Sequence, residues 1–139
     1  MAEERLFQLS IIAPERVFYE GQITMVELNT SEGEVGIYKN HIPMTMLLVP
    51  GIVTITEEGE KKHAAIHSGF MEVLPDKVTI MAELAEWPEE IDVNRAKEAE
   101  ARAERRLQMK DPNLNLQRAE LALRKAMVRL ELAGESGRK

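Results

Sequence analysis

The chain of 139 residues contains no cysteine, and only 4% of its residues are aromatic. The lack of cysteine excludes disulfide frameworks, cysteine-ligated zinc and thiol catalysis. Every apolar run is much shorter than the roughly 20 residues with which a helix crosses a bilayer. The sequence therefore predicts a protein that folds around an ordinary hydrophobic core and has no membrane-spanning helix.

Common catalytic and phosphate-binding motifs are missing as well. The sequence has no glycine-rich phosphate loop, no His-Glu-x-x-His and no Gly-x-Ser-x-Gly. His63 and His67 lie in an expected strand, where four residues of rise separate them by ~13 Å, too far to share one metal ion. His41 has no nucleophile near it in the sequence. We predict no metal site and no catalytic residue.

Charge divides the chain into two parts. The net charge is −6, from 18 basic and 24 acidic residues. Residues 1–87 hold 6 basic and 14 acidic residues, a net charge of −8, whereas residues 88–139 hold 12 and 10, a net charge of +2. Six of the 8 glycines also precede residue 88. These changes predict two domains, residues 1–87 and residues 88–139.

The first domain has the pattern of an all-β protein. Short runs of strand-forming residues alternate with turn signals such as Pro50-Gly51 and Glu58-Gly59. Such short runs at close spacing favour a sandwich or barrel, and we predict an antiparallel β-sandwich. The expected strands lie within residues 6–12, 23–30, 44–49, 52–56, 63–67, 70–74 and 78–84.

The second domain has helical periodicity. Alanines recur from Ala96 to Ala103, and alternating leucine and alanine recur from Leu116 to Ala133. Asp111-Pro112-Asn113 interrupts the pattern, and so short a connection makes the two helices antiparallel neighbours. The predicted fold class is therefore α+β, an N-terminal antiparallel β-sandwich followed by a C-terminal antiparallel two-helix hairpin.

Capping residues bound these helices. Asp92 or a neighbour is expected to cap the first, and either Asn113 or Asn115 the second, with Gly134 directly after its end. We call the contact surface between the two helices the seam. The first helix would contribute alanine to this seam, and the second helix would contribute leucine. We expect this small seam to need the β domain, a ligand or a partner for stability.

A candidate anion site follows from the hairpin geometry. Folding near Pro112 places Arg95 opposite Arg129, with Asp92 close by. Several cations around one carboxylate repel one another unless a further anion is present. The N-terminus of the first helix adds free N–H groups, which can also bind an anion. The pattern indicates a polyphosphate site at which Asp92 could accept a hydrogen bond from a ribose or adenine donor.

Other interpretations of the basic residues remain open. Helical arginine and lysine are usually solvated or paired with neighbouring glutamates. The same helices could also contact an acidic protein surface. A nucleic-acid-binding hairpin is disfavoured, because the hairpin has no aromatic residue and its neighbouring domain carries a charge of −8. A small-molecule enzyme would need a convergent reactive cluster, and the sequence shows none.

Three stretches together resemble one known family. They are residues 31–43 (SEGEVGIYKNHIP), residues 68–80 (SGFMEVLPDKVTI) and the hairpin segments IDVNRAK at 91–97 and RAELAL at 118–123. In this order and over nearly the whole chain, they resemble the ε subunit of F-type ATP synthases.

The resemblance implies a non-catalytic rotor subunit. Its β domain would dock on the γ subunit and the c-ring, with Glu34 and His41 as contact candidates. Its hairpin would alternate between a folded form and an extended form that reaches the α/β catalytic head and inhibits ATP hydrolysis. The protein would couple ion translocation to ATP synthesis. It would lie at the cell membrane, on the cytoplasmic side, peripherally and only through the complex.

Some bacterial members of this family bind ATP as a regulatory ligand on the folded hairpin. The resemblance implies that this chain does so without a required metal. Lys125 stands where ATP-binding relatives have arginine. Weaker ATP binding is therefore expected, because lysine lacks the planar, forked guanidinium group of arginine. Lys39-Asn40 also replaces the usual Pro-Gly. The implied ATP-binding residues are Glu86, Asp92, Arg95, Ala96, Arg102, Lys125 and Arg129.

Overall fold

The computed structural model describes residues 5–136. The chain divides between Ala85 and Glu86 into two compact units, a β unit and a helical unit. The charge pattern places the boundary two residues later, at 87/88. Within residues 5–136, none of the helices is both long and apolar enough to span a bilayer.

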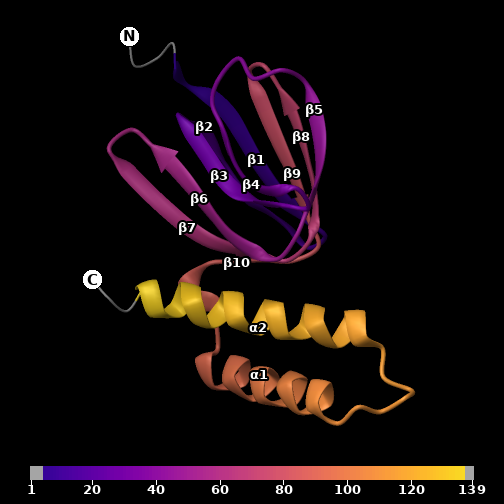
Figure 1. Ribbon diagram of the computed structural model, residues 1–139. Helices are drawn as coiled ribbons and strands as arrows, with labels where there is room; N and C mark the ends of the chain where they lie inside the picture. Colours follow the sequence, from indigo (N-terminus) through magenta and orange to yellow (C-terminus); the bar gives the residue numbers. More distant parts are fainter. Residues whose placement is uncertain (1–4, 137–139) are drawn as a thin grey trace. The chain divides into compact units, whose positions relative to one another are not determined.

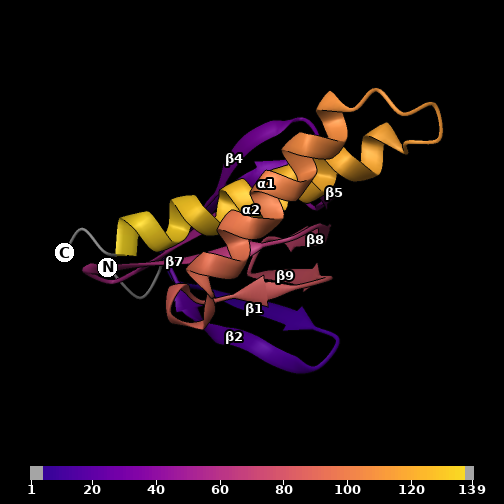
Figure 2. The same cartoon turned by 90° about the horizontal axis from the view of Figure 1, so that it is seen from below.

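The β unit is one sheet folded over into two layers (Figures 1 and 2). Its strand order is β10-β7-β6-β3-β5-β8-β9-β1-β2, and β4 pairs with β3 outside this path. The fold-over occurs at β3 and β5, which share the single pair Thr30 and Leu48. The strands are β1 (Phe7–Ala13), β2 (Arg16–Ile23), β3 (Met25–Thr30), β4 (Gly33–Ile37), β5 (Met44–Leu48), β6 (Gly51–Glu57), β7 (Glu60–Ile66), β8 (Gly69–Leu74), β9 (Lys77–Ala82) and β10 (Ala85–Glu86).

Alternation along the strands builds the core between the layers. Inward residues at every second position are fully buried, as Val53 and Ile55 of β6 and Val78 and Ile80 of β9 show. Most neighbouring strands are antiparallel, whereas β1 and β9 pair in parallel from Gln8 with Lys77 onward. Each inward aliphatic side chain contributes about 1.5–3 kcal/mol on burial, so this shared core is the main source of stability.

The structure contains three strands that the sequence does not predict, namely β2, β4 and the short β10. The β4 sequence GEVGI has two glycines and little strand preference, and β4 forms because it pairs with β3. β2 does carry a local signal, because Val17, Phe18 and Tyr19 are strand formers, and it pairs with β1. Tertiary pairing thus overrides weak local preference in β4.

A polar cluster joins β2 to the other layer. The Tyr19 hydroxyl donates to Oε2 of Glu57 at 2.5 Å, and Lys62 Nζ lies 3.3 Å from Oε1 of Glu57 and 5.8 Å from the centre of the Tyr19 ring. Burial, the hydrogen bond and the charges of Glu57 and Glu60 all raise the pKa of Tyr19. The pKa of Glu57 is lowered, chiefly by the Tyr19 hydrogen bond and then by Lys62, against an opposing desolvation effect.

The helical unit is an antiparallel hairpin preceded by the 3-10 helix η2 (Pro88–Glu90) (Figures 1 and 2). Helix α1 (Val93–Gln108) begins at Asp92, whose Oδ1 accepts from the Arg95 amide at 3.1 Å, so the predicted cap is confirmed. Lys110, with φ of 50°, follows the end of α1. Helix α2 (Leu116–Ser136) begins after Asn115, whose Oδ1 accepts from the Arg118 amide at 3.1 Å. Of the two predicted caps for α2, the structure selects Asn115.

Two details of the hairpin prediction are wrong. Helix α2 continues through Gly134 to Ser136, so this glycine does not end the helix. Within the predicted seam of α2, the buried residues are alanines: Ala119 and Ala126 are buried, Leu123 and Leu130 are half-buried, and Leu116 is exposed. Small side chains occupy the seam because they let the two helix backbones approach closely.

Candidate functional site

A cavity of about 210 Å³ lies at the start of the hairpin, entirely within the helical unit. The residue before η2, the end of η2, the first turn of α1 and the later part of α2 converge there. The lining residues are Glu86, Glu90, Asp92, Arg95, Ala96 and Arg129. The cavity therefore joins charged groups from both helices, and it exists only while the hairpin is folded.

Glu86 and Arg129 form an ion pair in this cavity. The Nε of Arg129 donates to Oε1 of Glu86 at 2.7 Å, a short charge-assisted hydrogen bond between residues 43 positions apart. This bond holds the segment before η2 against α2. The hairpin geometry predicts arginines that repel one another around one carboxylate, and for Arg129 this prediction is wrong because Glu86 already balances its charge.

Two further carboxylates hold the backbone at this corner. Oε1 of Glu90 accepts from the Trp87 amide at 2.9 Å, and Asp92 caps α1. Both acidic groups thus accept from amides at helix starts, where the helix dipole favours negative charge. The cavity as folded combines three carboxylates with two arginines, so a polyanion must compete with the protein's own acids for Arg95 and Arg129.

Sequence reasoning missed Glu90 as a lining residue. The signal is nevertheless present: Pro88 stands at the first position of η2 and Glu90 at the third, which is the pattern of a capped helix start. The same segment holds the predicted domain boundary, where the change in charge is the more visible signal.

The structure brings together five of the seven residues implied for ATP binding. Glu86, Asp92, Arg95, Ala96 and Arg129 line the cavity, whereas Arg102 and Lys125 do not. Arg102 is exposed two turns further along α1, about 10 Å from Arg95 in helix rise. Lys125 lies one turn before Arg129 on α2. A ligand longer than the cavity would be needed to contact these two outer cations.

The side chain of Ala96 is almost fully buried at the cavity wall, with a relative exposure of 2%. It faces α2 in the same register as the other seam alanines, since Ala96 and Ala103 are spaced as Ala119 and Ala126 are. A larger side chain at position 96 would fill the cavity and separate the helices. The small residue therefore makes room for the site.

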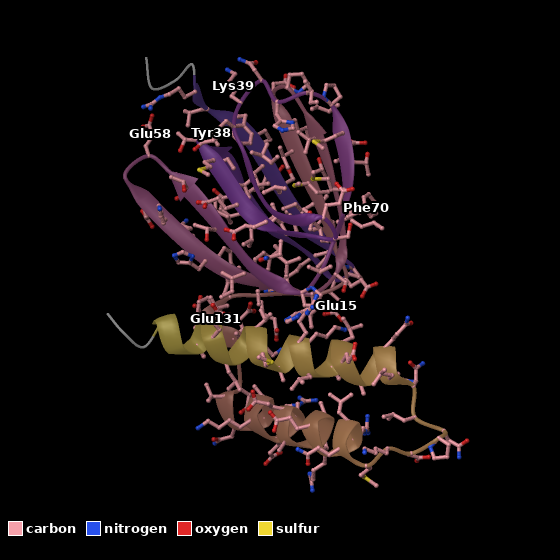
Figure 3. The ribbon with its side chains drawn as sticks, in the orientation of Figure 1. Glu15, Tyr38, Lys39, Glu58, Phe70 and Glu131 are labelled. Carbon is pink, nitrogen blue, oxygen red and sulfur yellow. The ribbon has the colours of Figure 1, made fainter. Side chains whose placement is uncertain are left out.

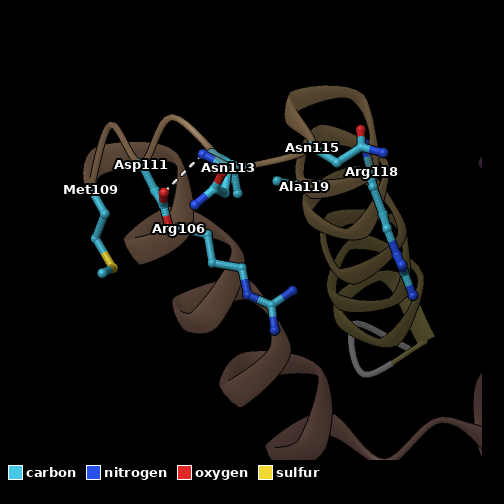
Figure 4. Close-up of a pocket in the computed structure, with 8 residues that line it drawn as sticks. Arg106, Met109, Asp111, Asn113, Asn115, Arg118 and Ala119 are labelled. Atoms are coloured by element: carbon cyan, nitrogen blue, oxygen red, sulfur yellow. Dashed lines mark hydrogen bonds between the residues drawn. The ribbon is translucent and has the colours of Figure 1, made fainter.

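A second, larger cavity of about 570 Å³ lies at the tip of the hairpin, where the helices are joined (Figure 4). Arg106 of α1 and Arg118 of α2 border it, and the Asn113 amide donates to Oδ1 of Asp111 at 2.9 Å. The other lining residues are Met109, Leu114, Asn115 and Ala119. The tip thus presents cations beside exposed apolar groups.

The two contact candidates of the β unit are separated by β4. Glu34 is exposed in the first half of β4 and pairs with Asn29, whereas His41 lies beyond the other end of the strand. Nδ1 of His41 is 2.9 Å from the carbonyl oxygen of Ile42. Asn40 adopts a φ of 67°, and its amide donates to the Pro75 carbonyl at 2.7 Å, so asparagine supplies the left-handed conformation here.

Figure 3 shows Tyr38, Lys39 and Glu58 at one end of the β unit, opposite Glu15.

Among the described residues, no three or more His, Asp or Glu side chains are arranged to hold a metal ion. His63 instead lies 3.1 Å from the Thr54 hydroxyl, and His67 is buried. The charged groups that line the cavity of the helical unit are carboxylates and arginines, which can contact hydrogen-bond donors and anions respectively.

Two family models match the chain in tandem. The β-sandwich domain of the ATP synthase delta/epsilon chain matches residues 6–88, and the long α-helix domain of the same chain matches residues 89–134. This chain belongs to the ATP synthase delta/epsilon chain family. The predicted α+β fold class and the resemblance to the ε subunit are thereby confirmed.

Curated relatives support the epsilon assignment over most of the chain. The ATP synthase epsilon chain of Halalkalibacterium halodurans is 46% identical over 127 residues, which cover 91% of this chain and 96% of the relative. The epsilon chain of Caldanaerobacter subterraneus subsp. tengcongensis is 42% identical over 133 residues, covering 95% and 96%. The molecule is thus an ATP synthase subunit of epsilon type.

Solved structures of similar fold come from ATP synthase assemblies. A chain in the OSCP, F1 and c-ring assembly of Euglena gracilis mitochondrial ATP synthase matches with a TM-score of 0.80 and 27% identity, covering 93% of this chain and 81% of that chain. A chain of the Tetrahymena thermophila central stalk and c-ring has a TM-score of 0.56 at 14% identity, covering 94% and 95%, and shows the shared fold alone.

Proposed function

We propose that this chain is a non-catalytic regulatory subunit of the central stalk of ATP synthase. Its β unit docks on the γ subunit and the c-ring, with contacts that include Glu34 and His41. It thereby helps to couple ion translocation to ATP synthesis. It is held at the cytoplasmic side of the cell membrane by its partners. Family membership and the similar chains in F1 and c-ring assemblies support this placement.

The hairpin is the regulatory element of this proposal. In the folded form it binds ATP, and in the extended form it reaches the α/β catalytic head and inhibits ATP hydrolysis. The observation that carries the proposal is that Arg95 of α1 and Arg129 of α2 line one cavity. A ligand that contacts both helices binds only the folded form and shifts the population toward it. At 100 times its dissociation constant, such a ligand adds about 2.7 kcal/mol of stability.

ATP must rearrange the cavity to bind. Drug-sized ligands occupy pockets of about 300–1,000 Å³, and the cavity measures about 210 Å³. Opening the Glu86–Arg129 pair would release Arg129 for phosphate and Glu86 for a hydrogen-bond donor of the adenine or ribose. The phosphate chain would then extend along the hairpin toward Arg102 and Lys125. No metal is required in this arrangement, because arginines supply the positive charge.

An extended hairpin would present its basic tip to the catalytic head. Arg106 and Arg118 at the tip cavity would attract acidic segments of the catalytic head. The net charge of +2 on residues 88–139 favours the same attraction. The weak alanine seam supports a hairpin that opens when no ligand holds it.

The experiment that tests the ligand is a calorimetric titration of the full chain with ATP. Wild type should bind, whereas Arg95→Ala and Arg129→Ala should each weaken binding by at least about tenfold, a loss of about 1.4 kcal/mol. Arg106→Ala, on α1 but outside the cavity, is the matched control and should bind as wild type does. No heat at millimolar ATP, with all variants alike, would rule out the ligand.

The inhibitory role is tested by deleting residues 89–139. The truncated subunit should still assemble into the ATP synthase, and ATP hydrolysis by the complex should rise. Hydrolysis that is unchanged after this deletion, with assembly intact, would argue against inhibition by the hairpin.

A further inference from the structure

The last residues of the β unit are each held by a hydrogen bond. The Leu84 carbonyl accepts from the His67 amide at 2.9 Å. Nη2 of Arg16 donates to the next carbonyl, that of Ala85, at 3.2 Å, although 69 positions separate the two residues in sequence. Ala85 is buried, and it is the residue at which the β unit ends. The chain is therefore fixed to the β unit up to the boundary with the helical unit.

Arg16 stands where it can hold this carbonyl firmly. It is the first residue of β2 and directly follows Glu15, which lies at the same end of the β unit as β10 (Figures 1 and 3). Its Cζ is 5.0 Å from the centre of the Phe18 ring, and Phe18 is buried. The ring supports the guanidinium by a cation–π contact, so less side-chain freedom remains to be lost in the hydrogen bond.

The carbonyl that Arg16 holds belongs to the peptide group that joins the two units. In a planar peptide, the Ala85 carbonyl lies in one plane with the nitrogen and Cα of Glu86. A hydrogen bond to this oxygen therefore restrains the backbone at Glu86 as well. Glu86 is the first residue of the helical unit, and its Oε1 accepts from Nε of Arg129 at 2.7 Å. Two arginines thus hold neighbouring residues, one through the backbone of Ala85 and the other through the side chain of Glu86.

We propose that Arg16 is a positioning residue for the ATP site of the folded hairpin. The inference rests on the proposed function and adds a residue of the β unit to it. Arg16 acts by fixing the Ala85–Glu86 peptide, and this peptide directs the Glu86 carboxylate to the cavity that Glu86 and Arg129 line. Without the hydrogen bond the peptide rotates more freely, and Glu86 must be ordered each time a nucleotide binds. That extra loss of conformational freedom lowers the affinity for ATP.

The stability of the β unit depends little on this side chain. Arg16 is exposed, and the pairing of β2 with β1 continues beyond it from Val17 to Ile23. The buried residues of β2 are Phe18, Tyr19 and Ile23. Removal of an exposed side chain usually changes stability little. A substitution at Arg16 therefore reports on the linker and not on the core.

Calorimetric titration of the full chain with ATP tests the role of Arg16. Arg16→Met keeps an apolar stem but has no N–H donor, and it should bind ATP about fivefold more weakly than wild type, the equivalent of one hydrogen bond. Arg16→Lys restores a charged donor and should bind within about twofold of wild type. Lys77→Met is the matched control, because Lys77 is an exposed cation at the start of β9, and it should bind as wild type does.

Inorganic triphosphate distinguishes positioning from a general weakening of the hairpin. It has no adenine or ribose for Glu86 to contact, so Arg16→Met should bind it no more weakly than wild type does. Thermal unfolding should show Arg16→Met and wild type equally folded. Hydrogen exchange of the ligand-free chain should be at least about fivefold faster at the Glu86 amide in Arg16→Met, because that N–H belongs to the released peptide.

The outcomes separate this inference from the proposed function. If wild type binds no ATP, the proposed ligand fails. If wild type and Arg16→Met bind ATP equally well, Arg16 is not a positioning residue, and the proposed function stands. Equal losses for ATP and triphosphate, or unchanged exchange at the Glu86 amide, would also overturn the inference, because Arg16 would then act by a route other than the Ala85–Glu86 peptide.

Discussion

The Nε of Arg129 donates to Oε1 of Glu86 at 2.7 Å, so the cavity of the folded hairpin already contains an anion for one of its two arginines. A phosphate group that enters must compete with this carboxylate for the same guanidinium. The pair therefore connects ligand affinity to the protein's own charge balance.

Glu86→Gln should strengthen the binding of inorganic triphosphate, which has no adenine or ribose. Removal of the competing carboxylate leaves Arg129 free for the anion, and the gain should be about fivefold, or about 1 kcal/mol. Isothermal titration measures it, and Glu131→Gln, an exposed carboxylate on the same helix, should leave affinity unchanged. Weaker triphosphate binding by Glu86→Gln would show that Glu86 positions Arg129 and does not compete for it.

The pH dependence of stability should reveal the Tyr19–Glu57 hydrogen bond. The fold lowers the pKa of Glu57 from its ordinary value of 4.5, so the ionised carboxylate stabilises the folded state above about pH 4.5. This contribution is lost as the pH falls through the lower pKa of the folded state.

Urea unfolding of wild type and Glu57→Gln measures that contribution. Wild type should be more stable at pH 7 by about 1 kcal/mol, and the difference should shrink to zero at low pH. Glu58→Gln, an exposed neighbour, is the control and should show no such difference. A difference between wild type and Glu57→Gln that stays constant with pH would exclude an ionised Glu57 as its cause.

Gly69 should tolerate no side chain. Its φ is +128°, and a Cβ built there would overlap the backbone oxygen of Met81 on the paired strand β9. Gly69→Ala should therefore destabilise the β unit by about 3 kcal/mol or more, because the clash is with backbone. Gly59 also has a positive φ, +72°, but has open space around it, so Gly59→Ala should cost only about 1 kcal/mol. Urea denaturation compares the two, and equal losses would show that conformation alone, without the clash, sets the cost.

The sequence predicts the elements whose signals are local. Asp92 before the α1 periodicity and Pro112 between the helices are visible without the structure, and both lie where the pattern places them. Strands such as β4 are not visible, because β4 forms by pairing with β3 and has little strand preference of its own. Likewise, hairpin register predicts that Arg95 and Arg129 meet. It does not predict that Glu86, from outside both helices, reaches Arg129, because that contact depends on the path of η2.

The alanine seam should set the balance between folded and extended hairpins. Ala103 and Ala119 are buried, with relative exposures of 3% each, so Ala103→Leu forces the helices apart in the folded form. The extended form has no seam that leucine could disrupt. Its helix propensity is also nearly unchanged by the substitution, because alanine and leucine are both strong helix formers. The substitution should therefore favour the extended form by about 2 kcal/mol.

Two measurements check this shift. Ala103→Leu should weaken ATP binding in calorimetry by about thirtyfold, the equivalent of that 2 kcal/mol, and should lower ATP hydrolysis when the variant is assembled into the complex. Ala101→Leu is the control, because Ala101 is exposed on the same helix and should change neither property. The two readouts must move together, since one equilibrium governs both. Weaker ATP binding with unchanged hydrolysis would mean that the folded hairpin binds ATP but does not regulate the catalytic head.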